Sequence, residues 1–326
     1  MSNSNHPPGH PPSNSTHRVD RHPPSVDGLL IVDKPDGWTS HDVVAKVRGI
    51  MKTRRVGHTG TLDPFATGVL VICLNQATRL AQFLTADDKE YVATVRFGYA
   101  TDTGDLTGTP LTPLTDAGHL DAEKIQEALT HFRGKILQTP PMYSAKKIGG
   151  VKLYEMARRG EEIERQAVEI EIKELVLGDE PPRDSDLARD FVIRVVCSSG
   201  TYIRTLAEDI GQRLGIGAHL TQLRRTRAGR CEIARAVTLE RLAELAATGM
   251  AEGQLISMNE ALVLPEAFLD AAEVAKATHG NTIRFNADWV AGTLVKLLDE
   301  RQQLVAVAEY WPEHRTLQPR VVLVEQ

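Results

Sequence analysis

The sequence predicts an α+β fold followed by a small β-rich module. Segments with the alternation of a half-buried strand, such as residues 89–98, are interspersed with amphipathic helical segments, such as residues 40–51. Toward the C-terminus this pattern gives way to short strands separated by turn residues. The expected divisions are a polar tail at 1–26, a main domain at 27–258 and a β-rich domain at 259–326.

Length and composition are those of a globular protein. The chain has 326 residues, which is enough for two domains, with 41% hydrophobic and 25% charged residues. The tail is rich in Pro, Ser, Asn and His, and we expect it to be disordered because it cannot bury enough apolar surface. Neither a long apolar run nor a secretory signal occurs, which predicts no membrane span and a cytoplasmic protein.

The three cysteines, Cys73, Cys197 and Cys231, are widely spaced and form no C-x-x-C pair. This spacing argues against a disulfide framework or a zinc site, and it fits a reducing compartment. Each cysteine lies in an apolar or strand-like context, so we expect all three to be buried as small hydrophobic residues.

Hydrophobic patterns define the elements of the first third. Residues 28–32 form a short apolar strand, and Ser40 is a suitable N-cap for the helix that follows. Residues 69–74 are continuously apolar, which is typical of a strand buried on both faces. Residues 76–84 have a helical pattern, and residues 89–98 form the next strand.

The remaining elements follow from the same patterns. Helices are expected at 121–132, from about 203 through 214, and at 238–247. Residues 219–230 alternate apolar and basic side chains, which predicts a strand with one charged face. The other predicted strands lie at 168–177, 190–197, 281–286, 293–298, 303–310 and 319–325.

One loop concentrates the chemistry. Residues 55–68, R-V-G-H-T-G-T-L-D-P-F-A-T-G, hold a single carboxylate, Asp63, among three glycines and three threonines. Glycine allows a backbone to approach a ligand closely, and threonine hydroxyls can hold a carboxylate in place. A turn in which Asp63 bonds to nearby backbone is the simpler interpretation of an isolated Asp-Pro, and catalysis is the alternative.

The whole string resembles the catalytic motif of the TruB family of RNA pseudouridine synthases, G-H-x-G-x-L-D-P-x-A-x-G. The resemblance extends over roughly residues 28–240. It implies a mixed, mainly antiparallel central sheet with flanking helices, and a PUA-like C-terminal domain. It also implies that the chain isomerises uridine to pseudouridine at position 55 in the T-loop of tRNA, with Asp63 as the essential residue.

Further motifs resemble the same family and imply roles for other residues. The opening L-I-V-D-K-P-x-G-W-T-S places Lys34 beside the active site, and K-x-Y places Tyr91 against the target base. Asp105 is expected to form hydrogen bonds in a loop next to the site, and Leu223 matches a pocket leucine. His58 is expected to fill the space that the uridine vacates when it flips out of the RNA.

A third motif, S-G-T-Y-I-R, contains Tyr202 and Arg204. Arg204 falls in the first turn of a predicted helix, where the helix dipole disfavours a cation. We therefore expect Asp63 to lie beside it, because an arginine within about 4–6 Å keeps a carboxylate ionised. By residue type alone, an arginine on a helix surface is the simpler interpretation.

The charge distribution favours a polyanionic partner although the formal net charge is −5. Residues 46–55 carry five basic side chains and no acidic one, and residues 220–236 carry five arginines against one glutamate. Residues 138–160 mix lysines with tyrosines and glycines. They align with the RNA-gripping insertion of the TruB family and are expected to form a flexible basic finger.

Isomerisation of uridine conserves all atoms and electrons, so no cofactor and no metal are expected. Residues 101–105 are acidic but lack the full calcium-loop pattern. The resemblance implies a monomer that acts on the T-arm of tRNA without a membrane, a protein partner or a guide RNA. Three alternatives stay open: a small-molecule hydrolase using Asp63, a non-catalytic RNA-binding module, and a guide-RNA-dependent synthase. Attack at the ribose C1′ or at the base C6 is also open.

Overall fold

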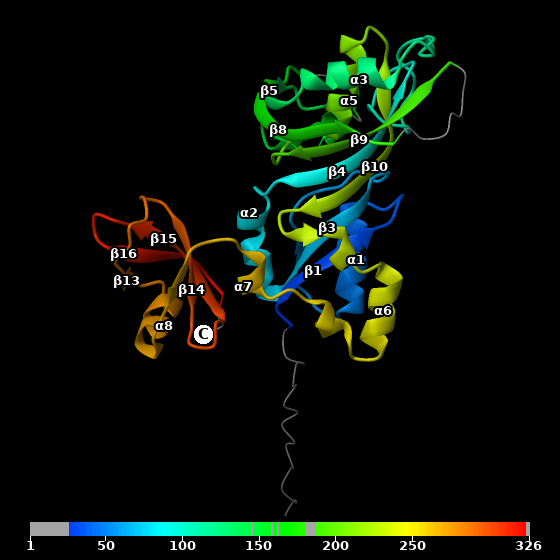
Figure 1. The fold of residues 1–326 in the computed structure, drawn as a ribbon. Coiled ribbons are helices and arrows are strands. Elements are labelled where there is room, and N and C mark those ends of the chain that lie inside the picture. Colours follow the sequence, from blue (N-terminus) through cyan, green and yellow to red (C-terminus); the bar gives the residue numbers. More distant parts are fainter. Residues whose placement is uncertain (1–25, 145, 158, 162, 180–186, 324–326) are drawn as a thin grey trace, which may run out of the picture.

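The computed structural model describes residues 26–144, 146–157, 159–161, 163–179 and 187–323. The predicted disordered tail therefore lies outside the described residues, except for its last position. Figure 1 shows a large body, built on one long sheet, with a smaller β-rich module at its side.

A nine-stranded sheet forms the large body. Its strands are β1 (Gly28–Lys34), β2 (Val56–His58), β3 (Thr67–Leu74), β4 (Lys89–Phe97), β5 (Gly134–Gln138), β8 (Val168–Leu177), β9 (Arg189–Cys197), β10 (Ala218–Ala228) and β11 (Cys231–Glu232). The order is β1-β3-β10-β4-β9-β8-β5, with β2 on β3 and β11 on β10. Only the β3–β10 pair is parallel among these pairings, which confirms the predicted mixed, mainly antiparallel sheet.

Strands β1 and β3 are buried on both faces, as their continuous apolar sequences predicted. On one face, Leu30 and Val32 pack against helices α1 (Ser40–Ile50) and α6 (Leu239–Ala247). Thr39, not Ser40, is the N-cap of α1, because Thr39 and Asp42 form a reciprocal capping box.

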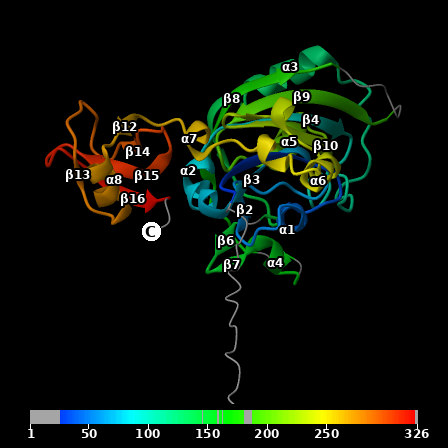
Figure 2. The ribbon, with the colours of Figure 1, turned by 90° about the horizontal axis from the view of Figure 1, so that it is seen from below.

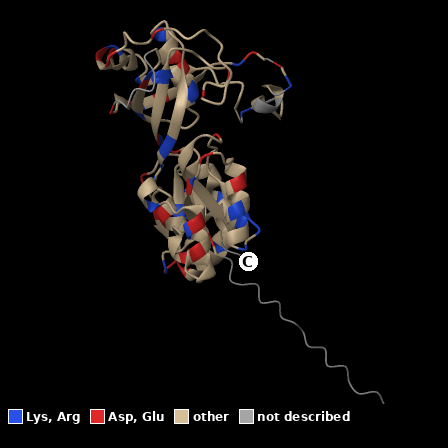
Figure 3. Cartoon of the chain, turned by 90° about the vertical axis from the view of Figure 1, so that its right-hand side faces the viewer, with Lys and Arg blue, Asp and Glu red and all other residues tan. Residues whose placement is uncertain are grey.

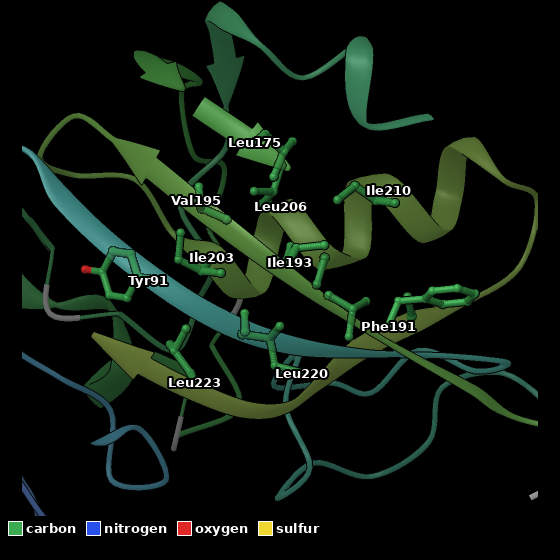
Figure 4. Packing of buried hydrophobic residues seen from close by; sticks show 14 of the residues in the cluster. Tyr91, Leu175, Phe191, Ile193, Val195, Ile203, Leu206, Ile210, Leu220 and Leu223 are labelled. Atoms are coloured by element: carbon green, nitrogen blue, oxygen red, sulfur yellow. The ribbon is translucent and has the colours of Figure 1, made fainter. Parts of the chain in front are cut away.

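The other half of the sheet is covered by helices α3 (Ala122–Thr130) and α5 (Ile203–Arg213). Figure 4 shows how Leu206 and Ile210 of α5 point toward Ile193 and Leu220 of the sheet. The continuous apolar layer between α5 and the strands fixes where the first turn of α5 lies, and Arg204 belongs to that turn.

The helical segment expected at 76–84 is present and ends at Leu84 as predicted, but most of it is a 3-10 helix, η1 (Asn75–Leu80), followed by one α-helical turn, α2 (Ala81–Leu84). Asn75 has φ +49°, and the Thr78 hydroxyl bonds to its carbonyl, so the backbone starts in a turn conformation. The prediction of one charged face for residues 219–230 was wrong, because the adjacent Arg224 and Arg225 lie on opposite faces of the strand and Arg225 is buried.

The predicted insertion contains a short hairpin, β6 (Lys147–Ile148) and β7 (Val151–Lys152), followed by helix α4 (Leu153–Ala157). Figure 2 shows the hairpin and α4 projecting from the large body. Strands β6 and β7 form a two-stranded sheet of their own, apart from the nine-stranded sheet. The projection is therefore a surface feature rather than part of the central sheet.

The C-terminal module is β-rich, as predicted, although its strands are shorter or shifted. The elements from the end of the main sheet onward are η2 (Ile233–Arg235), η3 (Ala251–Gln254), α7 (Met258–Ala261), β12 (Glu266–Phe268), α8 (Ala271–Thr278), β13 (Ile283–Arg284), β14 (Leu294–Leu298), β15 (Leu304–Trp311) and β16 (Thr316–Val322). The strands form a sheet with the order β12-β14-β15-β16-β13. The prediction missed α8, which begins with a capping box between Asp270 and Glu273.

The two bodies share a buried apolar cluster. Leu29 and Ile31 of β1 belong to the same cluster as Leu304 and Val307 of β15. The three cysteines are free and buried, as predicted, and burial raises the pKa of Cys73 to about 12 and those of Cys197 and Cys231 to about 11. Within the described part of the chain, every helix is too short or too polar to cross a membrane.

Candidate active site

The loop that carries Asp63 lies between β2 and β3, and it is fastened on both sides of that residue. The Ser40 hydroxyl accepts a hydrogen bond from the Leu62 N–H at 2.9 Å and donates to the Leu62 carbonyl at 3.2 Å. The Lys34 ammonium donates to the Pro64 carbonyl at 2.9 Å. Asp63 is therefore held on a rigid backbone, although it lies in a loop.

Arg225 fastens the same loop from the opposite side. Its Nε donates to the Val69 carbonyl at 2.7 Å and its Nη2 to the Gly60 carbonyl at 3.1 Å. Only 3% of Arg225 is exposed. Gly68 makes this close approach possible: it has φ +97°, and a Cβ there would lie 2.2 Å from the Arg225 carbonyl oxygen.

Asp63 and Arg204 form a two-pronged ion pair. The Arg204 Nε lies 2.9 Å from Asp63 Oδ2, and its Nη2 donates to Oδ1 at 3.4 Å. The remaining donors reach the Thr103 carbonyl at 2.7 Å and the Tyr143 carbonyl at 2.6 Å. The expectation that Asp63 offsets Arg204 at the start of α5 is confirmed.

Electrostatics at Asp63 are a balance of opposing effects. Burial raises the pKa of the Asp63 carboxyl above its ordinary value, Arg204 opposes this shift, and the nearby Asp105 carboxylate adds to it. The predicted influence of Arg204 has the right sign, but burial is the larger cause. The Asp63 side chain is 35% exposed toward the cleft, so water still solvates the carboxylate and limits that effect.

Asp63 and Arg204 line a cleft that also contains Tyr91, Tyr202 and Leu223. Figure 4 shows Tyr91 at the edge of the apolar core near Ile203 and Leu223, with its hydroxyl pointing away from the core. Burial raises the pKa of the Tyr91 phenol, so it stays protonated at neutral pH. The cleft thus offers a carboxylate, a fixed guanidinium and a flat aromatic ring to one ligand.

Two other predicted site residues, Asp105 and Lys34, are buried and do not line the cleft. Asp105 is fixed by three donors, the Thr103 hydroxyl and the N–H and hydroxyl of Thr107, as the prediction of a hydrogen-bonding role required. One of its oxygens lies 3.7 Å from Arg204 Nη1. Lys34 is fully buried, and burial lowers the pKa of its ammonium to about 8.

His58 lies outside the residues that line the cleft. Its Nδ1 accepts a hydrogen bond from the Gly60 N–H at 3.3 Å, and its ring meets the edge of His41 with centroids 5.6 Å apart. Burial lowers the pKa of His58, so the imidazole is neutral at pH 7. A ligand would therefore meet His58 as an uncharged ring, through van der Waals contact rather than through attraction to a positive charge.

Sequence reasoning missed three polar groups of the site: Arg225, Lys89 and Glu208. Lys89 lines the cleft and opens the K-x-Y string, so the motif itself was a signal. Glu208 is one helical turn after Arg204, and burial raises the pKa of its carboxyl to about 7 while Arg204 opposes the shift. The i,i+4 spacing from Arg204 could have identified it.

Comparison with known proteins assigns this architecture to a class. A sequence model described as "TruB family pseudouridylate synthase (N terminal domain)" matches residues 48–203, and one described as "tRNA pseudouridylate synthase B C-terminal domain" matches residues 204–269. The boundary between the two matches falls inside α5, so it does not separate structural domains. The mixed sheet and its cleft are those of a pseudouridine synthase fold.

Curated relatives agree over most of the chain. Proteins named tRNA pseudouridine synthase B are 42% identical over 87% of this chain and 96% of the relative in Solibacter usitatus, and 39% identical over 92% and 98% in Bacillus cereus strain ZK. A third, from Geobacter sulfurreducens, is 46% identical over 73% of this chain and 76% of its own. The chain belongs to the TruB family.

Solved structures give the same overall fold. A chain from an H/ACA RNP bound to a substrate RNA containing 2′-deoxyuridine has a TM-score of 0.70 and 26% identity, covering 91% of this chain and 85% of its own. A chain from a Cbf5-Nop10-Gar1 complex has a TM-score of 0.69 and 29% identity, covering 92% and 84%. The likeness therefore includes both the large body and most of the C-terminal module.

Proposed function

We propose that this chain converts uridine to pseudouridine at position 55 in the T-loop of tRNA, with Asp63 as the catalytic residue. The observation that carries the proposal is the two-pronged ion pair between Asp63 and Arg204, which faces a cleft beside Tyr91. The curated relatives named tRNA pseudouridine synthase B support the choice of tRNA as substrate.

The reaction breaks the N1–C1′ bond, turns the uracil and joins C5 to C1′. The base loses its C5 proton and gains one at N1, so the product is an isomer and the chemistry requires no redox group or metal. An ionised carboxylate can begin this sequence by attacking C1′ or by adding to C6 of the base. Both routes need Asp63 free of protons and close to the nucleotide.

Arg204 and Tyr91 have separate roles in this scheme. The planar guanidinium holds both carboxylate oxygens and thereby fixes the direction of the attacking oxygen. Tyr91 of β4 is paired with Arg225 of the neighbouring strand β10, and Arg225 donates a hydrogen bond to the protonated Tyr91 phenol. The Tyr91 ring can stack on the uracil. Tyr202 and Leu223 complete the wall against which the base lies.

A uridine that is stacked in folded RNA must leave its stack to reach Asp63, because Asp63 lines a cleft together with Arg204 and Tyr91. We assign to His58, a neutral ring at the start of the loop that carries Asp63, the role of occupying the space left in the RNA. The hairpin insertion is linked to the same site, since the Tyr143 carbonyl accepts from Arg204. We assign the gripping of RNA to residues 138–160.

The same proposal covers the partners and the setting. Naked tRNA is the expected substrate, with the T-arm bound by a monomer in the cytoplasm, and without a guide RNA or a protein partner. Structural relatives from guide-RNA particles make this a point to test. Activity of the purified chain on tRNA transcripts, without added components, distinguishes the two arrangements.

The test is to replace Asp63 with Asn or Ala and map pseudouridine in unmodified tRNA. Either variant should form no pseudouridine and should bind tRNA with an affinity close to that of the parent, because the carboxylate does chemistry rather than docking. Near-normal turnover by Asp63→Asn would refute the assignment. Release of free uracil by the parent would instead indicate a hydrolase, and tRNA binding without any reaction would indicate a binding module.

A further inference from the structure

Trp38 is an exposed tryptophan in the segment between β1 and α1. It has 36% of its surface exposed. The other two tryptophans lie in the C-terminal module with aromatic neighbours: Trp289 stacks on Phe285 at a centroid distance of 5.4 Å, and Trp311 lies 6.2 Å from the ring of His314. An indole left partly open to water needs an explanation, because tryptophan stabilises a protein mainly by being buried.

Trp38 lines a shallow hollow together with Gly37, Asp42, Ala45 and Lys46. The last three occupy one face of α1 at the i, i+3 and i+4 positions. Ala45 is exposed, and no heavy atom lies within 4 Å of where a Cβ on Gly49 would be. The indole and the small residues of α1 therefore present a low apolar surface that a flat ring can cover.

The acidic groups at this hollow are already engaged by the backbone. The Asp42 carboxylate accepts from the Thr39 N–H at 2.9 Å and from its hydroxyl at 2.6 Å, and these bonds lower the pKa of Asp42. The Asp36 carboxylate accepts from the Gly37 N–H at 2.7 Å. Both carboxylates thus serve the turn and the start of the helix.

Further cations follow Lys46 in the chain. The run from α1 to the residue before β2, called here the basic strip, consists of Lys46, Arg48, Lys52, Arg54 and Arg55. All five side chains are exposed, and none is within ion-pair distance of an acidic group in the described part of the chain. Their field is therefore directed at solvent, where a polyanion can bind.

Several basic residues elsewhere on the surface are paired with acidic ones. Arg194 lies 2.6 Å from Glu174, Arg241 lies 2.8 Å from Glu244, and Lys173 lies 2.7 Å from Asp88. Figure 3 shows the same mixture over the large body, with Lys and Arg interspersed among Asp and Glu. The basic strip differs from those positions because it lacks such acidic neighbours among the described residues.

The hollow is joined rigidly to the catalytic loop. The Gly37 N–H donates to the Pro64 carbonyl at 3.0 Å, and Pro64 follows Asp63 directly. Ser40, at the first turn of α1, bonds in both directions to Leu62. The segment that carries the exposed indole is therefore fixed relative to the loop that carries Asp63.

We propose that Trp38 and Ala45 form a stacking site for a second, unpaired base of the RNA, with adjoining phosphates on Lys46 and the rest of the basic strip. An aromatic platform beside cations is the general means of binding single-stranded nucleic acid. The inference rests on the proposed function, since the RNA is that enzyme's substrate. One indole and one methyl group offer too little apolar area for a protein partner.

The experiment uses the full chain with Asp63→Asn, so that binding is measured without turnover. Tryptophan emission and filter binding are followed while unmodified tRNA, a single-stranded RNA heptamer, or the same heptamer without bases is added. Either RNA with bases should quench the emission, and Trp38→Phe should abolish that quenching while retaining affinity, because phenylalanine also stacks. Trp38→Ala should weaken RNA binding by about 5- to 100-fold.

Two further variants complete the design. Phe268→Ala is the matched control: it removes an exposed aromatic ring, 59% accessible, from the C-terminal module, and it should leave affinity unchanged. Lys46→Gln should reduce the salt dependence of binding by about one phosphate contact. Circular dichroism of each variant checks that the fold is intact.

Several outcomes would overturn the stacking site. These are unchanged affinity in Trp38→Ala, equal quenching in Trp38→Phe, or equal binding of the heptamer that lacks bases. If the unsubstituted chain forms pseudouridine while Trp38 stays insensitive to RNA, this inference fails and the proposed function stands. If RNA quenches Trp38 but the unsubstituted chain forms no pseudouridine, the stacking site stands and the proposed function fails.

Discussion

The Arg204 guanidinium binds two backbone carbonyls in addition to its carboxylate partner, Asp63. Its Nε and both terminal nitrogens reach the carboxylate of Asp63 and the carbonyls of Thr103 and Tyr143. These acceptors come from three separate loops, so one side chain fixes their relative positions. Only 5% of the Arg204 side chain is exposed, which strengthens each of these interactions.

Replacing Arg204 with lysine keeps the charge and removes this geometry. We expect Arg204→Lys to lower kcat by on the order of 100-fold, because the carboxylate loses its fixed direction. The affinity for tRNA should stay close to that of the parent. Single-turnover kinetics and filter binding measure the two effects. Arg213→Lys, on an exposed turn of the same helix, is the control, and equal activity of both variants would contradict the proposed fork.

Glu208 makes stability depend on pH near neutrality. Its pKa is raised to about 7 in the folded protein, against an ordinary value of 4.5 in the unfolded chain. The fold therefore favours the protonated carboxyl, and this contribution is lost as the pH rises from 4.5 through 7.

We expect Glu208→Gln to stabilise the protein at pH 8 by up to about 3 kcal/mol relative to its effect at pH 4.5, because the amide never ionises. Thermal unfolding of both proteins at the two pH values measures the difference. Glu240→Gln, at an exposed position of α6, is the matched control for the change from carboxylate to amide. A difference that is the same at both pH values would contradict the raised pKa.

At the scale of elements, β10 is the strand that builds the site. It pairs in parallel with the start of β3 and antiparallel with β4, and Leu223 to Arg225 pair regularly with Ala93 to Tyr91. Leu223 and Arg225 are two residues apart, so the regular alternation of the strand places both on the face that lines the cleft. The register shifts of β10 lie on either side of this stretch.

Gly68 permits the contact between β3 and β10, so Gly68→Ala should be strongly destabilising. The new Cβ would overlap the Arg225 carbonyl at 2.2 Å, and φ +97° is unfavourable for alanine. We expect a loss well above about 1 kcal/mol in the free energy of unfolding, measured by urea denaturation. Gly49→Ala, in α1 with open space around it, should instead gain about 0.5–1 kcal/mol. Similar effects of the two substitutions would contradict this account.

The elements that the sequence predicted best are those governed by local patterns. Alternate residues of β1 and β3 enter apolar clusters on opposite faces of the sheet, and α1 follows the spacing of its valines. The failures have different causes. Arg225 is buried because its face of β10 is covered by tertiary packing, which the local pattern does not show. The start of α8 is marked by the local capping box of Asp270 and Glu273, a signal that the prediction of a β-rich module overlooked.

The same division applies to the site. Asp63, Arg204 and Tyr91 were identified from motif positions, and the predicted proximity of the first two needed only the argument about helix dipoles. Arg225 could not be identified in this way, because its importance arises from burial, and only its spacing from Arg204 gave a signal for Glu208. Burial of a charged side chain depends on how the elements pack, which local sequence patterns do not specify.

At the scale of the whole molecule, the C-terminal module is anchored to the sheet that carries the catalytic loop. Along β15, Val307 enters the cluster shared with β1, whereas Val305 faces the core of the module itself. Arg79 of η1 also donates to the Val322 carbonyl. We therefore expect local opening of one body to affect the other through β1.

Val307→Ala and Val305→Ala remove the same two methyl groups at neighbouring positions. Each should cost roughly 2 kcal/mol. Because of its contacts, Val307→Ala should speed amide hydrogen exchange in β1 as well as in β15. Val305→Ala should affect the C-terminal sheet alone. Exchange followed by mass spectrometry tells them apart, and unchanged protection of β1 in Val307→Ala would show that the bodies are energetically independent.

The buried thiols have a practical consequence for following this enzyme at work. All three cysteines are shielded, and their raised pKa values keep them as unreactive thiols at neutral pH. A cysteine introduced in place of the exposed Arg159, next to the hairpin, should therefore be the one that takes up a maleimide dye. The projection could then be tracked by fluorescence while tRNA binds, with the native cysteines left in place.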